Sequence, residues 1–306
     1  MSDNKFKFVK LDETKSERIA APEYSYWGSV FKKFFQSKVA IFMLILVAIL
    51  LLMSIIQPIF SQYNHLDLPG VNDKSLNFLP PSMKHPFGTD DVGRDVFDMV
   101  WSGARISLFI AFVSTIITNF IGVIVGMWWG FSKRVDKVMI EVYNVIANVP
   151  FTLIVMVMAY VLGSGIWQLI FALSITSWVG TAYFVRVQVM IIRDREYNLA
   201  SRTLGSSTSK IITHNILPYL VSVLVTLFSR DIPSIISYEV FLGFLGIGLG
   251  QDTASLGRVV QEHSLFMQSK PHLFLIPVLI TAVISVSLYI VGQTLADASD
   301  PKNHMI

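Results

Sequence analysis

The chain has 306 residues, of which 53% are hydrophobic and only 15% are charged, and its mean hydropathy is +0.58. These values lie outside the range of soluble globular domains and indicate an integral membrane protein. A net charge of +3, from 24 Lys and Arg against 21 Asp and Glu, does not point to a nucleic-acid partner, and the absence of cysteine excludes disulfides, thiolate metal sites and cysteine nucleophiles.

A charged tail, residues 1–38, precedes the first apolar run. Its end, PEYSYWGSVFKKFFQSK, places aromatic residues at helical spacing beside Lys32, Lys33 and Lys38. This pattern predicts an amphipathic helix that lies in the membrane interface. The alternative is an aromatic belt on a longer first transmembrane helix. In both cases the tail is expected to be cytoplasmic.

Six apolar segments are long enough to cross a bilayer core of about 30 Å, which takes roughly 20 helical residues. In chain order they are Val39–Ile59, Ile106–Met127, Met139–Leu162, Ile166–Phe184, Ile216 to about Ile236, and Leu273–Leu295. Seventeen of the 24 Lys and Arg lie in segments that face the cytoplasm if the N-terminus is inside, and the remaining seven do not. Because cytoplasmic loops are enriched in Lys and Arg, both termini are expected inside.

The segment after the first span, LDLPGVNDKSLNFLPPSMKHPFGTDDVGRD, is rich in Pro, Gly, Asn and Asp, which indicates an irregular extracellular excursion. Residues 39–105 would therefore hold the first span and this loop, and residues 106–296 the main transmembrane domain. Charged residues at the end of the loop either dock a partner protein or cap the second span, since acidic groups favour a helix N-terminus. They are Asp90, Asp91, Arg94 and Asp95.

Sequence motifs of common enzymes are missing. The Gly-Lys pair of a phosphate-binding loop does not occur, nor does G-x-G-x-x-G, H-E-x-x-H or G-x-S-x-G, and the six His are scattered. We therefore expect no catalytic residue, no metal and no cofactor bound by this chain. Ionisable residues inside the predicted spans, Glu141, Arg230 and Asp231, are expected near span ends, where their side chains reach water. A charged site at the bilayer midplane is thus not predicted.

Polar residues in the third and fourth spans are candidates for the wall of a substrate path shared with a similar partner chain, the alternative being helix packing. Pro150 is expected to bend the third span, because proline lacks a backbone donor. The candidates for the path are Asn144, Asn148, Ser174, Thr176, Ser177 and Trp178.

Between the fourth and fifth spans, polarity returns in REYNLASRTLGSSTSKIITHNILP. Gly205 is expected to end a first short helix, and one of Ser206, Ser207 and Thr208 to cap a second. Pro218 fits the first turn of the following span. Residues 193–215 are thus predicted to form a cytoplasmic helix, a turn and a second helix.

This stretch resembles the cytoplasmic signature of importer permeases of the ATP-binding cassette class. Ala200 corresponds to the first alanine of the signature, Gly205 to its glycine, and Leu217 and Pro218 to its Leu-Pro. The sequence departs from the signature where it has Leu199 for a glutamate, Ser201 for an alanine and Asn215 for an isoleucine. The resemblance implies a role in coupling to an ATPase for Glu196, Leu199, Ala200, Ser201, Gly205, Leu217 and Pro218.

Three further stretches resemble permeases of dipeptide and oligopeptide importers, specifically the permease with a long N-terminal tail. They are HPFGTDDVGRDVFDMVWSGARISL, EVFLGFLGIGLGQ and VGQTLADASDPK. The resemblance covers roughly residues 30–302. It implies an all-α type I importer fold with six transmembrane helices, a cytoplasmic tail over residues 297–306, and a place in the cell membrane of a bacterium or archaeon.

The implied function is that of a permease subunit in an ATP-driven oligopeptide importer. The implied partners are a second homologous permease, two ATPase subunits that bind ATP and Mg, and an extracellular protein that delivers the peptide. Two alternatives remain open at this point: a secondary peptide or amino-acid carrier driven by an ion gradient, and a membrane scaffold that transports nothing.

Overall fold

The structure is a computed structural model that describes residues 25–61 and 63–300. Every regular element in this part of the chain is a helix, as predicted. Five helical stretches are long and apolar enough to cross a membrane: α2 (Lys38–Ser61), α4 (Val96–Phe131), α7 (Ile166–Arg193), Thr208–Phe244, and α12 (Pro271–Ser299). A sixth crossing is divided between α5 (Lys133–Ala147) and α6 (Phe151–Leu162), which are inclined to each other by 83°. The predicted all-α membrane fold is therefore confirmed.

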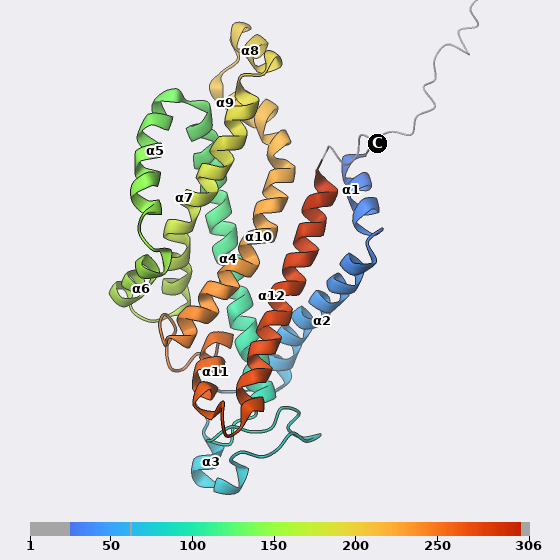
Figure 1. Cartoon of the computed structure of the whole chain (residues 1–306), viewed down its shortest axis with the longest axis vertical. Helices are drawn as coiled ribbons and strands as arrows, with labels where there is room; N and C mark the ends of the chain where they lie inside the picture. Colours follow the sequence, from blue (N-terminus) through green and yellow to red (C-terminus); the bar gives the residue numbers. More distant parts are fainter. Residues whose placement is uncertain (1–24, 62, 301–306) are drawn as a thin grey trace, which may run out of the picture.

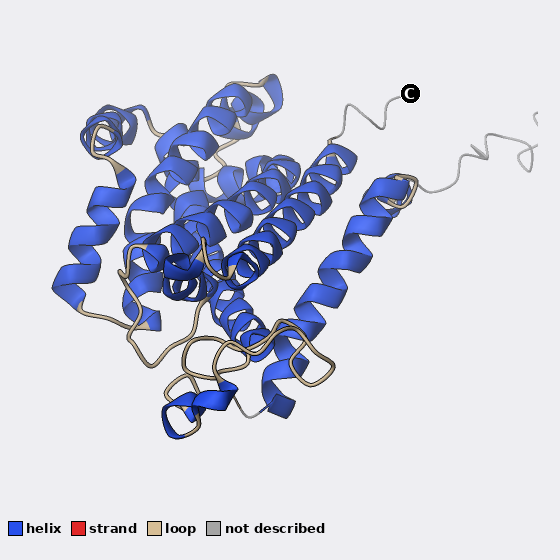
Figure 2. Cartoon of the chain, turned by 60° about the horizontal axis from the view of Figure 1, so that its bottom comes forward, coloured by secondary structure: helices blue, strands red, loops and turns tan. Residues whose placement is uncertain are grey.

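The two ends of the molecule differ in the segments that they gather (Figure 1). One end holds α1 (Tyr26–Phe34), α8 (Glu196–Thr203), α9 (Thr208–Lys210) and the last turn of α12. The other end holds α3 (Pro69–Asn72), η1 (Lys74–Leu76), α11 (Leu256–His263) and η3 (Ser264–Phe266), and Figure 2 shows its loops and short helices turned toward the viewer. Segments predicted to be cytoplasmic thus share the first end, and those predicted to be extracellular share the second.

The helix α1 is separate from the first span. Ser25 caps it by accepting from the Gly28 backbone N–H, and Val30 and Phe34 are buried against the C-terminal part of α12. Trp27 and Phe31 stay exposed on its other face. A separate amphipathic helix is therefore present, rather than an extension of α2. Residues 1–24 of the predicted N-terminal tail and 301–306 of the C-terminal tail lie outside the described part of the chain.

Close contact between α4 and α7 forms the centre of the bundle. Gly122, Gly126 and Gly130 recur once per helical turn on the face of α4 that meets α7. A Cβ atom on Gly126 would lie 2.6 Å from the Ala182 carbonyl oxygen and 2.7 Å from the Val185 Cβ. Small residues at this spacing let the backbones of membrane helices approach closely. Such close packing stabilises helix association in lipid, where no hydrophobic force draws the helices together. The sequence predictions missed this G-x-x-x-G-x-x-x-G signal.

Three predicted boundaries are wrong. The second span begins at Val96 instead of Ile106, because Asp95 caps α4 by accepting from the Phe97 N–H at 2.8 Å. The predicted domain boundary after residue 105 therefore falls inside a helix, and so does the one after residue 296, since α12 continues to Ser299. The third span bends at Pro150, as expected, but the bend is a full break after Asn148.

The fifth span also continues beyond its predicted end. The helix α10 (Leu217–Phe244) passes through Pro233 without stopping. Arg230 lies thirteen residues after its first residue and fourteen before its last, so the expectation that Arg230 and Asp231 sit near a span end is wrong. The charges are tolerated there because Arg230 and Asp231 form an ion pair with an N–O distance of 3.1 Å.

Candidate functional site

The polar stretch between α7 and α10 protrudes from the bundle (Figure 1). After α8 the chain turns at Gly205, whose φ of +81° is a conformation that L-residues other than glycine seldom adopt. Ser207 then caps α9 by accepting from the Lys210 N–H, and a π-helical segment, η2 (Ile211–Ile216), leads into α10. The predicted helix, turn and second helix are all present, and Ser207 is the cap.

Side-chain amides attach α8 to the bundle. The side chain of Asn198 is fully buried and donates from Nδ2 to the Ile192 carbonyl oxygen at 2.9 Å. Its Oδ1 accepts from Asn215 Nδ2 at 3.0 Å, and the same Asn215 nitrogen is 3.2 Å from Ser201 Oγ. Ser201 and Asn215 are two of the residues that depart from the signature, so the two departures meet in one hydrogen bond.

Two arginines connect the same region to the end of α4. Arg193 donates from Nη1 to the Gly130 carbonyl oxygen at 2.7 Å, and the Arg202 guanidinium lies over the Phe131 ring, 4.6 Å from its centroid. The helix α8 is therefore held by α4, α7 and η2 at once. A segment attached on three sides moves with the bundle rather than independently of it.

The outer surface of α8 is partly apolar. Leu204 is 86% exposed and Leu199 is 45% exposed, and Glu196 and Ala200 are exposed beside them. Of the other predicted coupling residues, Ser201 and Leu217 are half-buried, and Pro218 is exposed in the first turn of α10. The predicted residues thus divide between the surface of α8 and the base of α10.

The predicted path residues do not share one surface. Asn148 and Thr176 line a cavity of about 480 Å³ at the break between α5 and α6, while Asn144 is exposed on α5 and Trp178 is half-buried. Ser174 is only 3% exposed, which makes it part of the packed interior instead of a path wall. For Ser174 the helix-packing alternative is therefore correct.

A second, smaller cavity of about 120 Å³ lies between α4, α7 and α10. Ser177 is the one predicted path residue that reaches it. The cavity is lined by Thr118, Ser177, Gly180, Thr181, Arg230, Asp231, Ser234, Ile235 and Tyr238. Sequence reasoning missed the α10 residues because it placed Arg230 and Asp231 at the end of a span. A charged pair inside a long apolar helix was the available signal.

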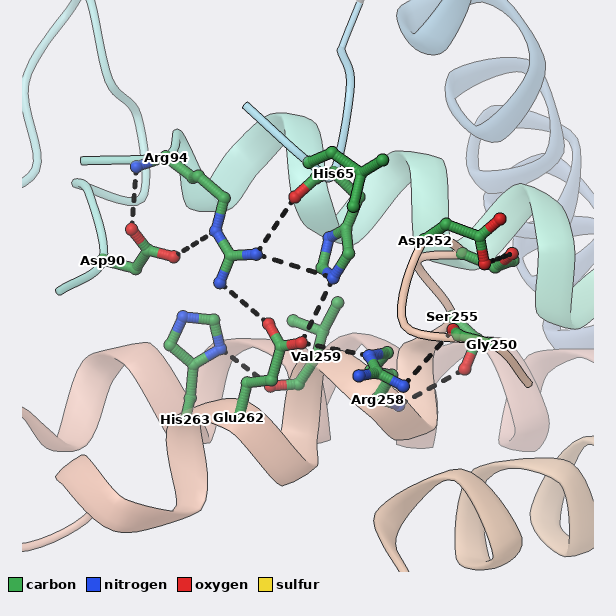
Figure 3. Close-up of polar contacts among 12 residues, drawn as sticks. His65, Asp90, Arg94, Gly250, Asp252, Ser255, Arg258, Val259, Glu262 and His263 are labelled. Atoms are coloured by element: carbon green, nitrogen blue, oxygen red, sulfur yellow. Dashed lines mark hydrogen bonds and ion pairs between the residues drawn. The ribbon is translucent and has the colours of Figure 1, made fainter. Parts of the chain in front are cut away.

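At the opposite end of the molecule, charged residues join the loop before α4 to α11 (Figure 3). Arg94 donates from Nε to the fully buried Asp90 at 2.7 Å and from Nη2 to Glu262 at 2.9 Å. Glu262 is also 3.1 Å from the Nε2 of His65 and accepts from the Nε of Arg258 at 3.1 Å. We call these five residues the outer cluster.

The charges of the outer cluster are mutually satisfied. Burial by itself would raise the pKa of the Glu262 carboxyl, but the His65 hydrogen bond and the Arg94 guanidinium outweigh it and hold that pKa at about 2. Likewise burial opposes the charge on Arg94, and the Asp90 and Glu262 carboxylates raise its pKa. Glu262 and Arg94 therefore stay ionised at neutral pH, and their ion pair fixes the loop on α11.

These contacts change the interpretation of the charged residues before α4. Asp90 and Arg94 are engaged inside the protein, and Asp95 caps α4 and also accepts from His85 Nδ1 at 2.7 Å. Asp90 is buried, and Arg94 and Asp95 are half-buried with their charges paired inside the chain, which favours capping and internal roles over docking for these three. Asp91 is exposed, and for it docking stays a prediction. Among residues 25–61 and 63–300, no three His, Asp or Glu side chains converge as metal ligands.

Two family models match the chain. Residues 121–304 match the model described as "Binding-protein-dependent transport system inner membrane component", and residues 25–81 match "N-terminal TM domain of oligopeptide transport permease C". The first match begins within α4 and extends past the end of α12, and the second covers α1 and α2; residues 82–120 lie between the two.

Curated relatives are similar over nearly the whole length. The oligopeptide transport system permease protein AmiD of Streptococcus pneumoniae is 51% identical over 300 residues, which are 98% of this chain and 97% of the relative. The oligopeptide transport system permease protein OppC of Bacillus subtilis is 34% identical over 301 residues, with the same coverage of each chain.

A solved structure also matches. It is described as inward-facing conformations of the MetNI methionine ABC transporter, and the match has a TM-score of 0.53 at 17% identity. It covers 66% of this chain and 96% of that one. At this identity the likeness concerns the fold alone.

Proposed function

The chain belongs to the family of binding-protein-dependent transport system inner membrane components, and from this membership we propose that it is the permease subunit of an ATP-driven oligopeptide importer. Its fold is that of a type I importer permease, as predicted. The oligopeptide as cargo is proposed because two relatives that align over 97% of their own length are oligopeptide permeases by name.

The observation that supports a role in coupling to an ATPase is the attachment of α8 to the bundle. This helix protrudes, exposes Leu199 and, at its C-cap, Leu204, and is attached by Asn198 to the end of α7 and to η2. A firmly attached helix transmits a displacement, whereas a loose loop would absorb it without shifting the equilibrium between two conformations. We therefore assign α8 as the surface on which an ATPase subunit docks.

The partners follow from this assignment. This chain has no phosphate-binding loop, so ATP and Mg would be held by two ATPase subunits beneath it, and the chain would bind no cofactor itself. A second permease would complete the substrate path, and an external binding protein would deliver the peptide.

The test places a charge on the exposed face of α8. Replacing Leu204, 86% exposed, with Asp is expected to reduce the amount of ATPase that copurifies with the permease, because an aspartate cannot be desolvated cheaply in an apolar contact. Leu265→Asp is the control, since Leu265 is 85% exposed but lies at the opposite end. Equal retention of the ATPase in both variants would contradict the proposal.

The ion-gradient alternative needs a separate test. A secondary carrier was expected to require a charged site deep in the membrane, and Arg230 and Asp231 in the middle of α10 remove that objection. Family membership supports the ATP-driven function instead. Uptake should stop when ATP is withheld from the reconstituted complex and should persist when ion gradients are dissipated.

A further inference from the structure

Polar residues occur along most of the length of α10. Polar side chains recur there at every fourth position: Ser222, Thr226, Arg230, Ser234 and Tyr238. Each step of four residues rotates by about 40° around the helix axis, so the row winds along α10. Arg230, Ser234 and Tyr238 lie within about 80° of one another and line one cavity, and we call these three the α10 stripe. Thr226, Arg230 and Tyr238 are exposed and the two serines are half-buried.

The position of Arg230 excludes contact with lipid tails. Its side chain is 55% exposed, yet it lies about 20 Å along the helix from Leu217, given a rise of 1.5 Å per residue. Arginines near the ends of a span can extend to the membrane surface, but one in the middle is found facing the interior of a bundle or a water-filled cavity. The α10 stripe therefore faces water or polar groups.

The cavity of about 120 Å³ lies beside the α10 stripe. Arg230, Ser234 and Tyr238 form one side of it, and Ser177 and Gly180 of α7 form another. No atom of the described residues would lie within 4 Å of a Cβ on Gly180, so this side of the cavity is open. The polar surface thus continues from α10 onto α7.

The charged pair is held in a defined geometry. Arg230 donates from Nε and Nη2 to Asp231 Oδ1 at 3.2 and 3.1 Å, and Asn119 Nδ2 donates to Asp231 Oδ2 at 3.1 Å. The carboxylate is thereby fixed from two helices, and it orients the guanidinium. For Nη1 of Arg230 no acceptor is present within the described residues, so this nitrogen can donate to a bound molecule.

We propose that the α10 stripe is a wall of the path taken by the cargo, and that Arg230 binds an oxygen of the passing peptide while Asp231 orients the guanidinium. The oxygen belongs to the terminal carboxylate or to a main-chain carbonyl, both of which accept hydrogen bonds from a guanidinium. This inference rests on the proposed function as a peptide permease and assigns it a contact residue.

The first experiment tests whether the α10 stripe is accessible to water. Because the chain has no cysteine, a single introduced thiol is its unique target for a water-soluble methanethiosulfonate reagent. Ser234→Cys in the complete reconstituted transporter should be modified, as read from the mass of this chain. Ile49→Cys is the control: Ile49 is 52% exposed in the middle of the apolar α2 and should not react. An unreactive Ser234→Cys, or equal reaction of both, would overturn the proposal.

The second experiment separates contact with cargo from neutralisation of Asp231. Arg230→Gln should lower the uptake of a tetrapeptide at low concentration about tenfold, the effect of one charge-assisted hydrogen bond. Arg230→Lys, which keeps the charge, should lose less. In the double variant Arg230→Gln with Asp231→Asn no unpaired charge remains, and uptake should still be low. If the double variant recovers wild-type uptake, Arg230 serves only Asp231 and the proposal fails.

A comparison of the peptide as a free acid and as a C-terminal amide identifies which peptide oxygen Arg230 contacts. If Arg230→Gln impairs uptake of the free acid only, and not of the C-terminal amide, the contact is the carboxylate; equal impairment of both assigns it to a carbonyl. No impairment of either contradicts the proposal. If the wild-type complex imports no peptide at all, the proposed function fails, whereas the labelling of Ser234→Cys still reports on the wall.

Discussion

Two polar side chains that depart from the importer signature form a hydrogen bond with each other. Ser201 and Asn215 differ from the importer signature in the same direction, from apolar to polar, and their side chains are 3.2 Å apart. The Ser201 hydroxyl thereby gives the half-buried Asn215 amide a second acceptor beside Asn198, and a satisfied amide avoids the cost of an unmade hydrogen bond. Sequence reasoning identified both departures but not their contact, since the two residues are fourteen positions apart.

Asn198 is the residue on which this attachment depends most. Asn198→Ala removes the donor to Ile192 and the acceptor of Asn215, a loss of about 1–3 kcal/mol of local stability. We expect reduced peptide uptake while ATP hydrolysis continues, measured together in proteoliposomes. The control is Thr203→Ala, because the Thr203 hydroxyl donates to the Ala200 carbonyl oxygen within α8 and, among the described residues, to no other helix. A parallel fall of uptake and hydrolysis in Asn198→Ala would argue against an attachment role.

Glu262 makes the outer cluster sensitive to acid. Its pKa is lowered from 4.5 to about 2, so the ionised carboxylate stabilises the folded state above pH 4.5, and this contribution is lost as the pH falls from 4.5 toward 2. The melting temperature of the purified complex should therefore drop between pH 7 and pH 3. Glu262→Gln should show a smaller drop, and Glu196→Gln, exposed on α8, should behave as the wild type. An identical drop in all three would refute this account.

At the scale of helices, apolar length alone predicted most of the bundle. The first predicted span, Val39–Ile59, differs from α2 by one residue at its start and two at its end. The errors occur where polar residues belong inside a helix, as with Arg230, because a pattern of apolar residues cannot show that Asn119 and Asp231 will meet across two helices. The same limit explains why Ser174 and Ser177 could not be told apart from sequence: their exposure depends on which face of α7 meets α4.

The contact of α4 with α7 should be intolerant of a single methyl group. Gly126→Ala would place its Cβ 2.6 Å from the Ala182 carbonyl oxygen, and the forced separation should cost about 1–3 kcal/mol. Gly180→Ala makes the same substitution in α7 in open space and should be neutral or stabilising by about 0.5–1 kcal/mol, the difference in helix propensity. Thermal unfolding of the two purified variants measures this; equal melting temperatures would exclude close packing at Gly126.

For the molecule as a whole, the turn at Gly205 should determine whether ATP hydrolysis by the partner subunits is coupled to peptide transport. A bulky residue there, as in Gly205→Val, is strained at a φ of +81° and should displace α8. We expect hydrolysis to continue in the membrane without peptide uptake. Gly163→Val is the matched control, since Gly163 has a φ of +80° and open surroundings but lies at the end of α6. Normal uptake by Gly205→Val would show that the turn plays no part in coupling.

The length of α4 has a mechanical consequence. Its 36 residues form one uninterrupted helix of about 54 Å, from Asp95 beside the outer cluster to Phe131 beneath Arg202. A rigid helix that rotates about a point between its ends moves those ends in opposite directions. A displacement of α8 would therefore move Val96, on the far side of the bilayer, in the opposite direction, together with the residues that contact it. No series of side-chain rearrangements between the two ends is needed.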